Sequence, residues 1–197
     1  MSSAELEREL QPFKIDRAKY PILAVVQRGY YRDTMGRKGV NDRGIYDDAW
    51  MLVTPNLFMA VNANADPSAA QGAVTGRASL EPGFWPMWRL DLHRGQYLAF
   101  CQRAADCIVR RDNTAGRPVG EKHPKWGTHL GGGRWRGWFG INGHRGGRTT
   151  TSSEGCITTP EPQWSGLIAA AESEARRLWA AKWKQAVIPC VLIDKAA

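Results

Sequence analysis

The segment from 140 to 158 contains the residues whose types and spacing are best suited to chemistry. His144 precedes a loop rich in Gly, Thr and Ser, and Cys156 follows that loop just before the expected start of a helix. A thiol is a good nucleophile as the thiolate, and both a nearby imidazole and a helix N-terminus lower its pKa. Gly155 lets the backbone approach a reacting carbonyl, so its N–H and that of Cys156 are candidate oxyanion donors. We therefore predict Cys156 as a nucleophile and His144 as its base.

The order of these residues along the chain narrows the class of thiol enzyme. All four histidines, at positions 93, 123, 129 and 144, precede Cys156. Papain-like enzymes place the cysteine first and the histidine later, so Cys156 does not fit that arrangement. Cys101 and Cys107 do precede a histidine, but neither has a glycine-flanked setting. The competing interpretation of Cys156, a small buried apolar residue, is disfavoured by its polar neighbours.

The same segment resembles the signature of a known family. A histidine beside glycines, a short spacer and then Ser-x-Gly-Cys followed by an apolar residue is similar to the L,D-transpeptidase (YkuD-like) catalytic domain, which processes peptidoglycan stem peptides. The wider pattern is closest to phage- and prophage-encoded members. It comprises Asn142-Gly143-His144-Arg145-Gly146-Gly147, Thr150-Thr151-Ser152-Ser153-Glu154-Gly155-Cys156 and Gln163-Trp164, with weaker likeness at Gly29-Tyr30, Tyr46-Asp47-Asp48, Asn62-Ala63-Asn64 and 97–102.

The resemblance implies a cysteine peptidase that acts on peptidoglycan stem peptides through a thioacyl enzyme, without metal or cofactor. Carried over by position, Cys156 is the nucleophile and His144 the base, while Gly155 flanks the oxyanion site and Ser153 lies beside it. Hydrolysis of the thioacyl enzyme makes the protein an endolysin-like peptidase, and transfer to an amine makes it a cross-linking transpeptidase. We expect hydrolysis, because the sequence shows no export signal and no wall-anchoring module.

Four residues near this pair are candidate substrate contacts. Arg145 and Arg148 follow the histidine, and a guanidinium can bind a stem-peptide carboxylate through two parallel hydrogen bonds. Trp138 is interleaved with glycine and arginine, as a groove-lining ring would be, and Asn142 lies two residues before the histidine. The competing interpretation is a solvated surface for the arginines and a place in the core for the tryptophan.

Two other functional classes stay open. Residues 134–138 and 144–148 mix cations, glycine and aromatic rings, which is typical of single-strand nucleic-acid binding. The chain lacks the common nucleic-acid-binding motifs, and this interpretation leaves Ser-x-Gly-Cys unexplained, so we expect no nucleic-acid partner. A metal site is the third interpretation, although the spacing of its candidate ligands matches no common metal motif. These ligands would be His123, His129, His144 and Cys156.

Length and composition indicate a globular chain. With 197 residues, 43% hydrophobic and 23% charged, we expect one domain spanning 1–197. A net charge of +8 suits a polyanionic partner such as bacterial peptidoglycan. The chain has no apolar run of about 18 residues that would span a membrane, and its charged N-terminus lacks the apolar stretch of a secretory signal. We therefore expect a monomer, made in the cytoplasm, that acts on the cell wall after release or delivery by another system.

The expected elements predict an α+β fold, β-rich and sandwich-like as in L,D-transpeptidase domains, with one long C-terminal helix. Thr158 or Thr159 as cap, Pro160 and Glu161 in the first turn, and apolar residues every three or four positions predict that helix. Long loops are expected at 63–82 and 114–134. A solvated turn is expected at Asp47 and Asp48, with a place beside the site as the alternative. Short apolar runs predict strands at 20–26, 45–54, 57–62, 84–93, 107–112, 135–142 and 187–193.

Overall fold

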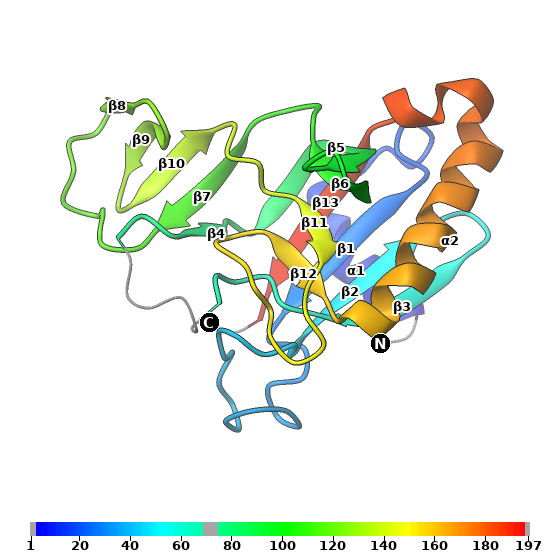
Figure 1. Cartoon of the computed structure of the whole chain (residues 1–197), viewed down its shortest axis with the longest axis horizontal. Helices are drawn as coiled ribbons and strands as arrows, with labels where there is room; N and C mark the ends of the chain where they lie inside the picture. Colours follow the sequence, from blue (N-terminus) through cyan, green and yellow to red (C-terminus); the bar gives the residue numbers. More distant parts are fainter. Residues whose placement is uncertain (1–2, 69–74, 196–197) are drawn as a thin grey trace.

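Two β-sheets and one long helix make up the fold in the computed structural model, which describes residues 3–68 and 75–195 (Figure 1). The larger sheet has eight strands in the order β12-β11-β6-β5-β13-β1-β2-β3. This architecture confirms the predicted β-rich α+β class with a long C-terminal helix. The strands of this sheet are β1 Leu23–Arg28, β2 Asp48–Val53, β3 Phe58–Ala63, β5 Gly83–His93, β6 Tyr97–Gln102, β11 Gly143–Arg145, β12 Ile157–Thr159 and β13 Ile188–Asp194.

The smaller sheet has five antiparallel strands in the order β4-β7-β10-β9-β8. Strands β8 and β9 lie within 114–134, where we expected a loop, so that expectation is wrong. Their glycine-rich sequence shows no clear alternation, and pairing along the β10 edge stabilises strands that local preference alone does not predict. The strands are β4 Ala78–Leu80, β7 Cys107–Arg111, β8 Lys122–His123, β9 Gly127–Gly131 and β10 Arg134–Gly137.

The larger sheet curves until its two edges nearly meet. Asn64, directly after β3, and Thr158 of β12 exchange two backbone hydrogen bonds with N···O distances of 2.8 and 2.9 Å. Because these residues belong to the two edges, the bridge makes the sheet a nearly closed, barrel-like structure. A barrel-like sheet therefore replaces the sandwich-like arrangement that we expected, since short apolar runs do not reveal strand order.

Large aromatic side chains fill the core against this curved sheet. The Trp50 ring centroid lies 5.4 Å from that of Trp88, 5.0 Å from Phe100 and 6.3 Å from Trp164. Gly143 of β11 packs directly against the same ring, because a Cβ at this position would lie 2.2 Å from Trp50 Cη2. The core therefore requires glycine at 143. The absence of a side chain there allows β11 to lie close to the Trp50 ring of β2.

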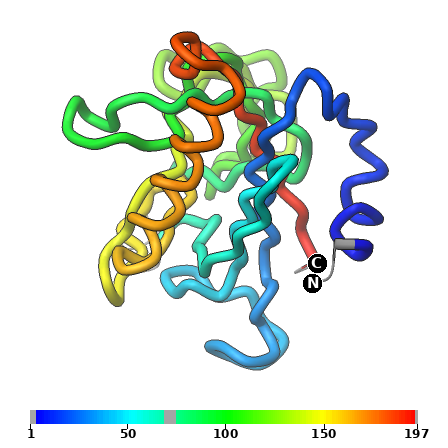
Figure 2. Tube along the Cα trace, turned by 90° about the vertical axis from the view of Figure 1, so that its right-hand side faces the viewer, coloured from blue at the N-terminus to red at the C-terminus, as the bar shows by residue number. Residues whose placement is uncertain are grey.

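Helices cover opposite faces of the larger sheet (Figure 2). Helix α2, Glu161–Trp179, buries an apolar stripe that includes Trp164 and Leu167, while α1, Ser3–Leu10, buries Leu6 and Leu10 on the other side. Strands β1, β2 and β13 are consequently buried along nearly their whole length. The 3-10 segments η1 (Gln11–Phe13) and η3 (Ala180–Gln185) follow the two helices. In the described part of the chain, no helix has the length and apolar character needed to cross a bilayer.

The start of α2 differs from the expected one. Thr158 and Thr159 belong to β12, and the N-cap is Pro160, which makes no side-chain capping bond. Glu161 does lie in the first turn, as expected. Cys156 therefore precedes a short strand rather than a helix. The favourable field of a helix N-terminus acts mainly within its first turn, so it does not account for the reactivity of this thiol.

Two expected surface features are in fact buried. Asp47 and Asp48 are 0% exposed, so the solvated turn is wrong. Residues 63–68 are also buried, and β4 occupies 78–80, so the expected loop at 63–82 is wrong for these parts. Residues 69–74 of that loop lie outside the described part of the chain.

Asp48 holds together segments that are distant in the sequence. Its Oδ1 accepts a hydrogen bond from the Gly29 N–H and its Oδ2 accepts one from the Ala65 N–H, both at 2.6 Å. Burial and the neighbouring Asp66 carboxylate raise the pKa of Asp48 to about 8. The side chain thus joins the end of β1 to the segment that follows β3.

We predict that Asp48→Asn lowers the free energy of unfolding by about 1–3 kcal/mol, because the amide nitrogen would face a buried N–H donor. Chemical denaturation measures this change. Asp91→Asn is the matched control, since this carboxylate is half-exposed and its interactions with Arg103 and the Leu92 N–H are open to solvent; the substitution should cost about 0–1 kcal/mol. Equal stabilities of the two variants would contradict the buried-acceptor role of Asp48.

Candidate active site

A cleft of about 1110 Å³ contains both Cys156 and His144. Its wall is contributed by both sheets. From the larger sheet come the end of β5, the start of β6 and strand β11, and from the smaller sheet come residues around β4, β7 and Trp126. The predicted nucleophile and base therefore face one shared space large enough for a peptide-sized ligand.

Parallel pairing of β11 with β12 brings the two residues together. Gly143 pairs with Ile157 and His144 pairs with Thr158, so Cys156 lies at the entrance to β12, diagonal to the histidine. Gly143 faces the Trp50 ring inside the core. Because side chains alternate along a strand, His144 faces away from the core and into the cleft.

The Cys156 thiol is half-buried and protonated in the resting protein. Its Sγ lies 3.3 Å from the Gly140 carbonyl oxygen, to which it donates. Burial raises the pKa of the thiol, while the Asn142 N–H and the Arg94 charge act in the opposite direction. A nucleophilic role for Cys156 would therefore require a base that removes its proton.

His144 has the tautomer that a base needs. Its Nδ1 lies 2.7 Å from the Arg145 carbonyl oxygen, which can only accept, so Nδ1 carries the hydrogen and Nε2 keeps a free lone pair. Burial lowers the pKa of His144 to about 4, and the charges of His93 and Arg94 add to this effect. The imidazole is consequently neutral across the physiological range.

A second histidine, which sequence reasoning missed, positions the first. The His93 ring at the end of β5 stacks on His144, with centroids 4.5 Å apart and 23° between the planes. The Asn142 side-chain nitrogen donates to His93 Nδ1 at 3.3 Å, and the Asn142 side-chain oxygen accepts from the Gln102 N–H at 2.8 Å. The predicted substrate contact Asn142 thus lines the cleft, but its side chain is engaged in holding the histidine stack.

Gln102 fixes the segment that contacts the thiol, and it too was missed as a site residue. Its Oε1 accepts the N–H groups of Phe139 and Ile141, each at 3.0 Å. These bonds lie on either side of Gly140, whose carbonyl faces Cys156. Only the family-like pattern at 97–102 pointed to this residue, because a buried amide has no spacing signal of its own.

Ser153 and Gly155 shape the loop that leads into Cys156. Ser153 Oγ donates to the Cys156 carbonyl at 2.6 Å and accepts the Gly155 N–H at 3.0 Å. Gly155 has φ +148°, and a Cβ there would lie 2.3 Å from the Ala78 carbonyl oxygen of β4. Ser153 therefore braces the loop, and Gly155 allows close contact with the smaller sheet. Of the two predicted oxyanion donors, the Gly155 N–H is used in the bond to Ser153 Oγ. The Cys156 N–H is the remaining candidate.

The predicted substrate contacts divide into two groups. Arg145 lines the cleft, with its guanidinium carbon 4.7 Å from the Tyr97 ring centroid. Arg148 and Trp138 are exposed, Trp138 by 60%, and neither is among the lining residues. Trp126 lines the cleft instead. The flexible glycine-rich segments around the predicted residues explain why sequence spacing did not reveal their direction.

The cleft is strongly basic. Six cationic side chains line it, against one carboxylate, Glu154. Such a surface concentrates anionic ligands and speeds their association at low ionic strength. The cationic residues are Arg77, Arg94, Arg103, Arg111, Lys125 and Arg145.

The alternative metal site is not assembled. The His129 ring is fully buried, with Nδ1 bonded to the Pro118 carbonyl at 2.9 Å and Nε2 accepting the Gly133 N–H at 3.2 Å. His123 stacks on Trp126 in the smaller sheet. Within 3–68 and 75–195, no three His, Cys, Asp or Glu side chains are grouped as metal ligands.

Comparison with known proteins finds no match to this chain among family models, curated proteins or solved structures. The likeness to the L,D-transpeptidase signature therefore rests on the residues of the His–Cys segment. The chemistry of the cleft has to be argued from its geometry and charge.

We predict that iodoacetamide alkylates Cys156 slowly near neutral pH and that the rate rises with an apparent pKa above the ordinary thiol value of about 8.5. The raised pKa of the thiol and the lowered pKa of His144 both favour the neutral pair over a thiolate–imidazolium pair. Peptide mass spectrometry distinguishes Cys156 from the three buried cysteines. A flat, fast rate between about pH 5 and pH 8 would show a preformed ion pair and contradict this prediction.

Proposed function

We propose that this chain is a cysteine peptidase with an L,D-transpeptidase-like fold that cuts peptidoglycan stem peptides in the cell wall. The observation that carries the proposal is the pair formed by Cys156 and His144 on adjoining strands. His144 has an unprotonated Nε2 and lines the same basic cleft as the thiol. The other three cysteines are buried, and none of them lines the cleft.

The proposed reaction begins with attack of Cys156 Sγ on the scissile carbonyl carbon. The S–H proton passes to His144 Nε2 as the C–S bond forms, and the Cys156 N–H donates to the developing oxyanion. Collapse of this intermediate breaks the C–N bond, and His144 returns the proton to the leaving amine. Water then attacks the thioacyl carbon, His144 again takes a proton, and the acid product leaves with the thiol restored.

Substrate binding assists proton transfer in this scheme. In the free cleft, burial and the charge of Arg94 oppose protonation of His144. A carboxylate of the bound peptide offsets that positive charge and raises the pKa of the imidazole, because a nearby anion stabilises its protonated form. The dyad is thus neutral at rest and becomes competent when an anionic peptide fills the cleft.

The charge of the cleft supports stem peptides as substrates, since these peptides carry several carboxylates. Nucleic acid is a weaker candidate for this surface. Of the two rings in segment 134–138, Trp135 is fully buried and the exposed Trp138 lies outside the cleft, so neither offers a stacking face within it. Hydrolysis is proposed ahead of cross-linking because water reaches an open cleft without a dedicated acceptor site.

The test is digestion of purified diaminopimelate-type sacculi, with released muropeptides identified by mass spectrometry. We expect wild-type protein to release fragments shortened in the stem peptide, with or without EDTA. Cys156→Ala should reduce release by about 10³-fold or more, and His144→Ala by about 10²–10⁴-fold. Cys101→Ala is the matched control, because that thiol is buried outside the cleft, and it should retain activity. Equal release by wild type and Cys156→Ala would refute the thiol mechanism.

A further inference from the structure

Two buried guanidinium groups form part of the cleft wall at the edge of the smaller sheet. Arg77 precedes β4 and Arg111 ends β7, and each residue is only 8% exposed. Both line the cleft. Within 3–68 and 75–195, neither makes an ion pair with a carboxylate, and the six residues 69–74 contain no Asp or Glu. Burying two cations without a counter-charge costs free energy, and a bound anion would reduce that cost.

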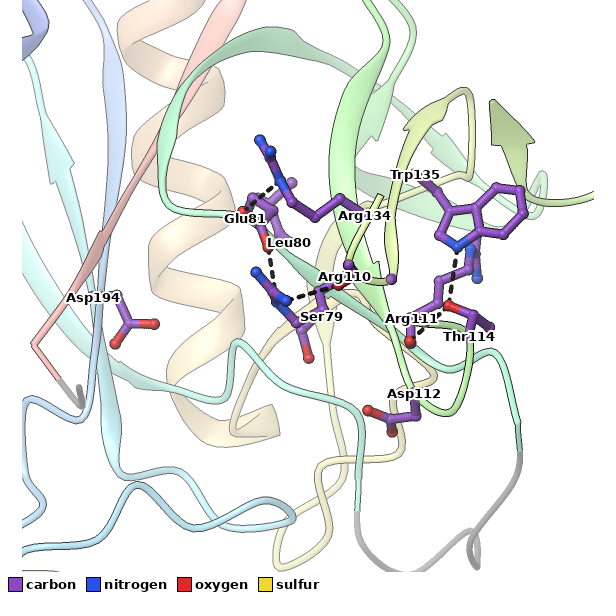
Figure 3. A network of polar contacts seen from close by, with 12 residues as sticks. Ser79, Leu80, Glu81, Arg110, Arg111, Asp112, Thr114, Arg134, Trp135 and Asp194 are labelled. Atoms are coloured by element: carbon purple, nitrogen blue, oxygen red, sulfur yellow. Dashed lines mark hydrogen bonds and ion pairs between the residues drawn. The ribbon is translucent and has the colours of Figure 1, made fainter. Parts of the chain in front are cut away.

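Neighbouring arginines do have carboxylate partners. Arg110 and Arg134 approach the two oxygens of Glu81 at 3.1 and 3.3 Å, and Arg43 binds Asp112 at 2.6 Å. Figure 3 shows Arg110, Arg134 and Glu81 close together, with Arg111 beside Trp135 and Asp112 pointing away from that ring. The charges of Arg43, Arg110 and Arg134 are therefore balanced by carboxylates, whereas those of Arg77 and Arg111 are not.

Each of the two guanidinium groups keeps an unused donor. Arg77 Nη1 donates to the Ser68 carbonyl at 3.0 Å, whereas its Nη2 is buried without a partner. Arg111 Nη1 donates to the Gly76 carbonyl at 2.6 Å, whereas its Nε is buried without a partner. A buried donor without an acceptor costs free energy, which a bound oxyanion would recover.

Aromatic rings hold Arg111 in place. Its guanidinium carbon lies 4.7 Å from the Phe139 ring centroid and 5.8 Å from that of Trp126. Burial lowers the pKa of Arg111 to about 10, so it stays charged near neutral pH. The group is thus a fixed cation, and little conformational entropy is lost when it binds an anion.

The position of the pair connects it to Cys156. Arg111 pairs across the sheet with Ala78, the residue after Arg77. Gly155 packs against the Ala78 carbonyl, so the loop that ends in Cys156 lies directly on this part of β4. An anion bound by either arginine would therefore lie near the nucleophile loop.

We propose that Arg77 and Arg111 form an anion-binding subsite with two positions, one at each guanidinium group, that hold carboxylates of the peptide substrate near Cys156. The identity of the ligand rests on the proposed function, whereas the need for an oxyanion rests on the two unpaired guanidinium groups. The subsite adds a specificity element from the smaller sheet to a dyad supplied by the larger one.

Calorimetric titration of the Cys156→Ala protein tests the subsite by binding alone. The ligands are a stem tetrapeptide containing diaminopimelate, the same peptide with every carboxylate amidated, and inorganic phosphate. We expect Arg77→Gln and Arg111→Gln, each made in that background, to weaken binding of the acidic peptide by about 10-fold to 100-fold. Binding of the amidated peptide should be weak and unchanged by either substitution.

Arg110→Gln is the matched control, because it removes a cation that already has Glu81 as its partner outside the cleft. It should leave peptide binding unchanged. Without ligand, Arg111→Gln should unfold at the same temperature as its parent or at a higher one, because it removes an unpaired buried charge. If a glutamine variant does not fold, the matching lysine variant keeps the charge without the planar fork and should also bind more weakly.

Binding of the acidic peptide with parental affinity by both arginine variants would overturn the subsite, whatever the sacculus digestion shows. Phosphate that binds more tightly than the peptide and displaces it would overturn the carboxylate assignment. Arginine-dependent peptide binding together with inactive wild-type protein would retain the subsite and refute the proposed peptidase. The two proposals therefore fail by different results.

Discussion

Asn64 and Thr158 exchange two backbone hydrogen bonds, and through them the short strand after Cys156 joins the far edge of the larger sheet. That strand also pairs with β11, so His144 and Cys156 are held by the closure of the sheet itself. On the inner side, the Trp50 ring fills the place where a side chain at 143 would lie. Core packing and sheet closure together orient the His144 side chain toward the cleft.

Charge is distributed unevenly over this scaffold. Cys156 and His144 lie in a cleft with six cations and one carboxylate. A separate group of acidic side chains, Asp48 and Asp66 among them, is buried with Arg28 where β1 ends and β2 begins. The acidic group is internally bonded and serves the fold. The cationic cleft is incompletely paired and suits an anionic ligand. The buried acidic group therefore stabilises the fold, whereas the charges of the cleft are available to a ligand.

The sequence predicted the β-rich class and the long helix, because each depends on local pattern: apolar runs or helical spacing. It also singled out Cys156 and His144 from a glycine-flanked cysteine and a nearby histidine, and both line one cleft. It did not predict closure of the sheet or strands β8 and β9, which depend on pairing between distant segments. The capping threonines were wrong because β12 uses Thr158 and Thr159 for pairing. His93, Gln102 and Arg111 were missed as site residues because only tertiary packing brings them to the cleft.

Intact-protein mass spectrometry after brief mixing with a stem peptide tests the proposed thioacyl chemistry most directly. We expect the protein mass to increase by that of the acyl fragment minus the thiol hydrogen. Peptide analysis should map this adduct to Cys156, and hydroxylamine should remove it. The adduct should not form in Cys156→Ala. Fragment release with no adduct in wild type, or an adduct of the same mass in Cys156→Ala, would contradict the assignment of Cys156 as the nucleophile.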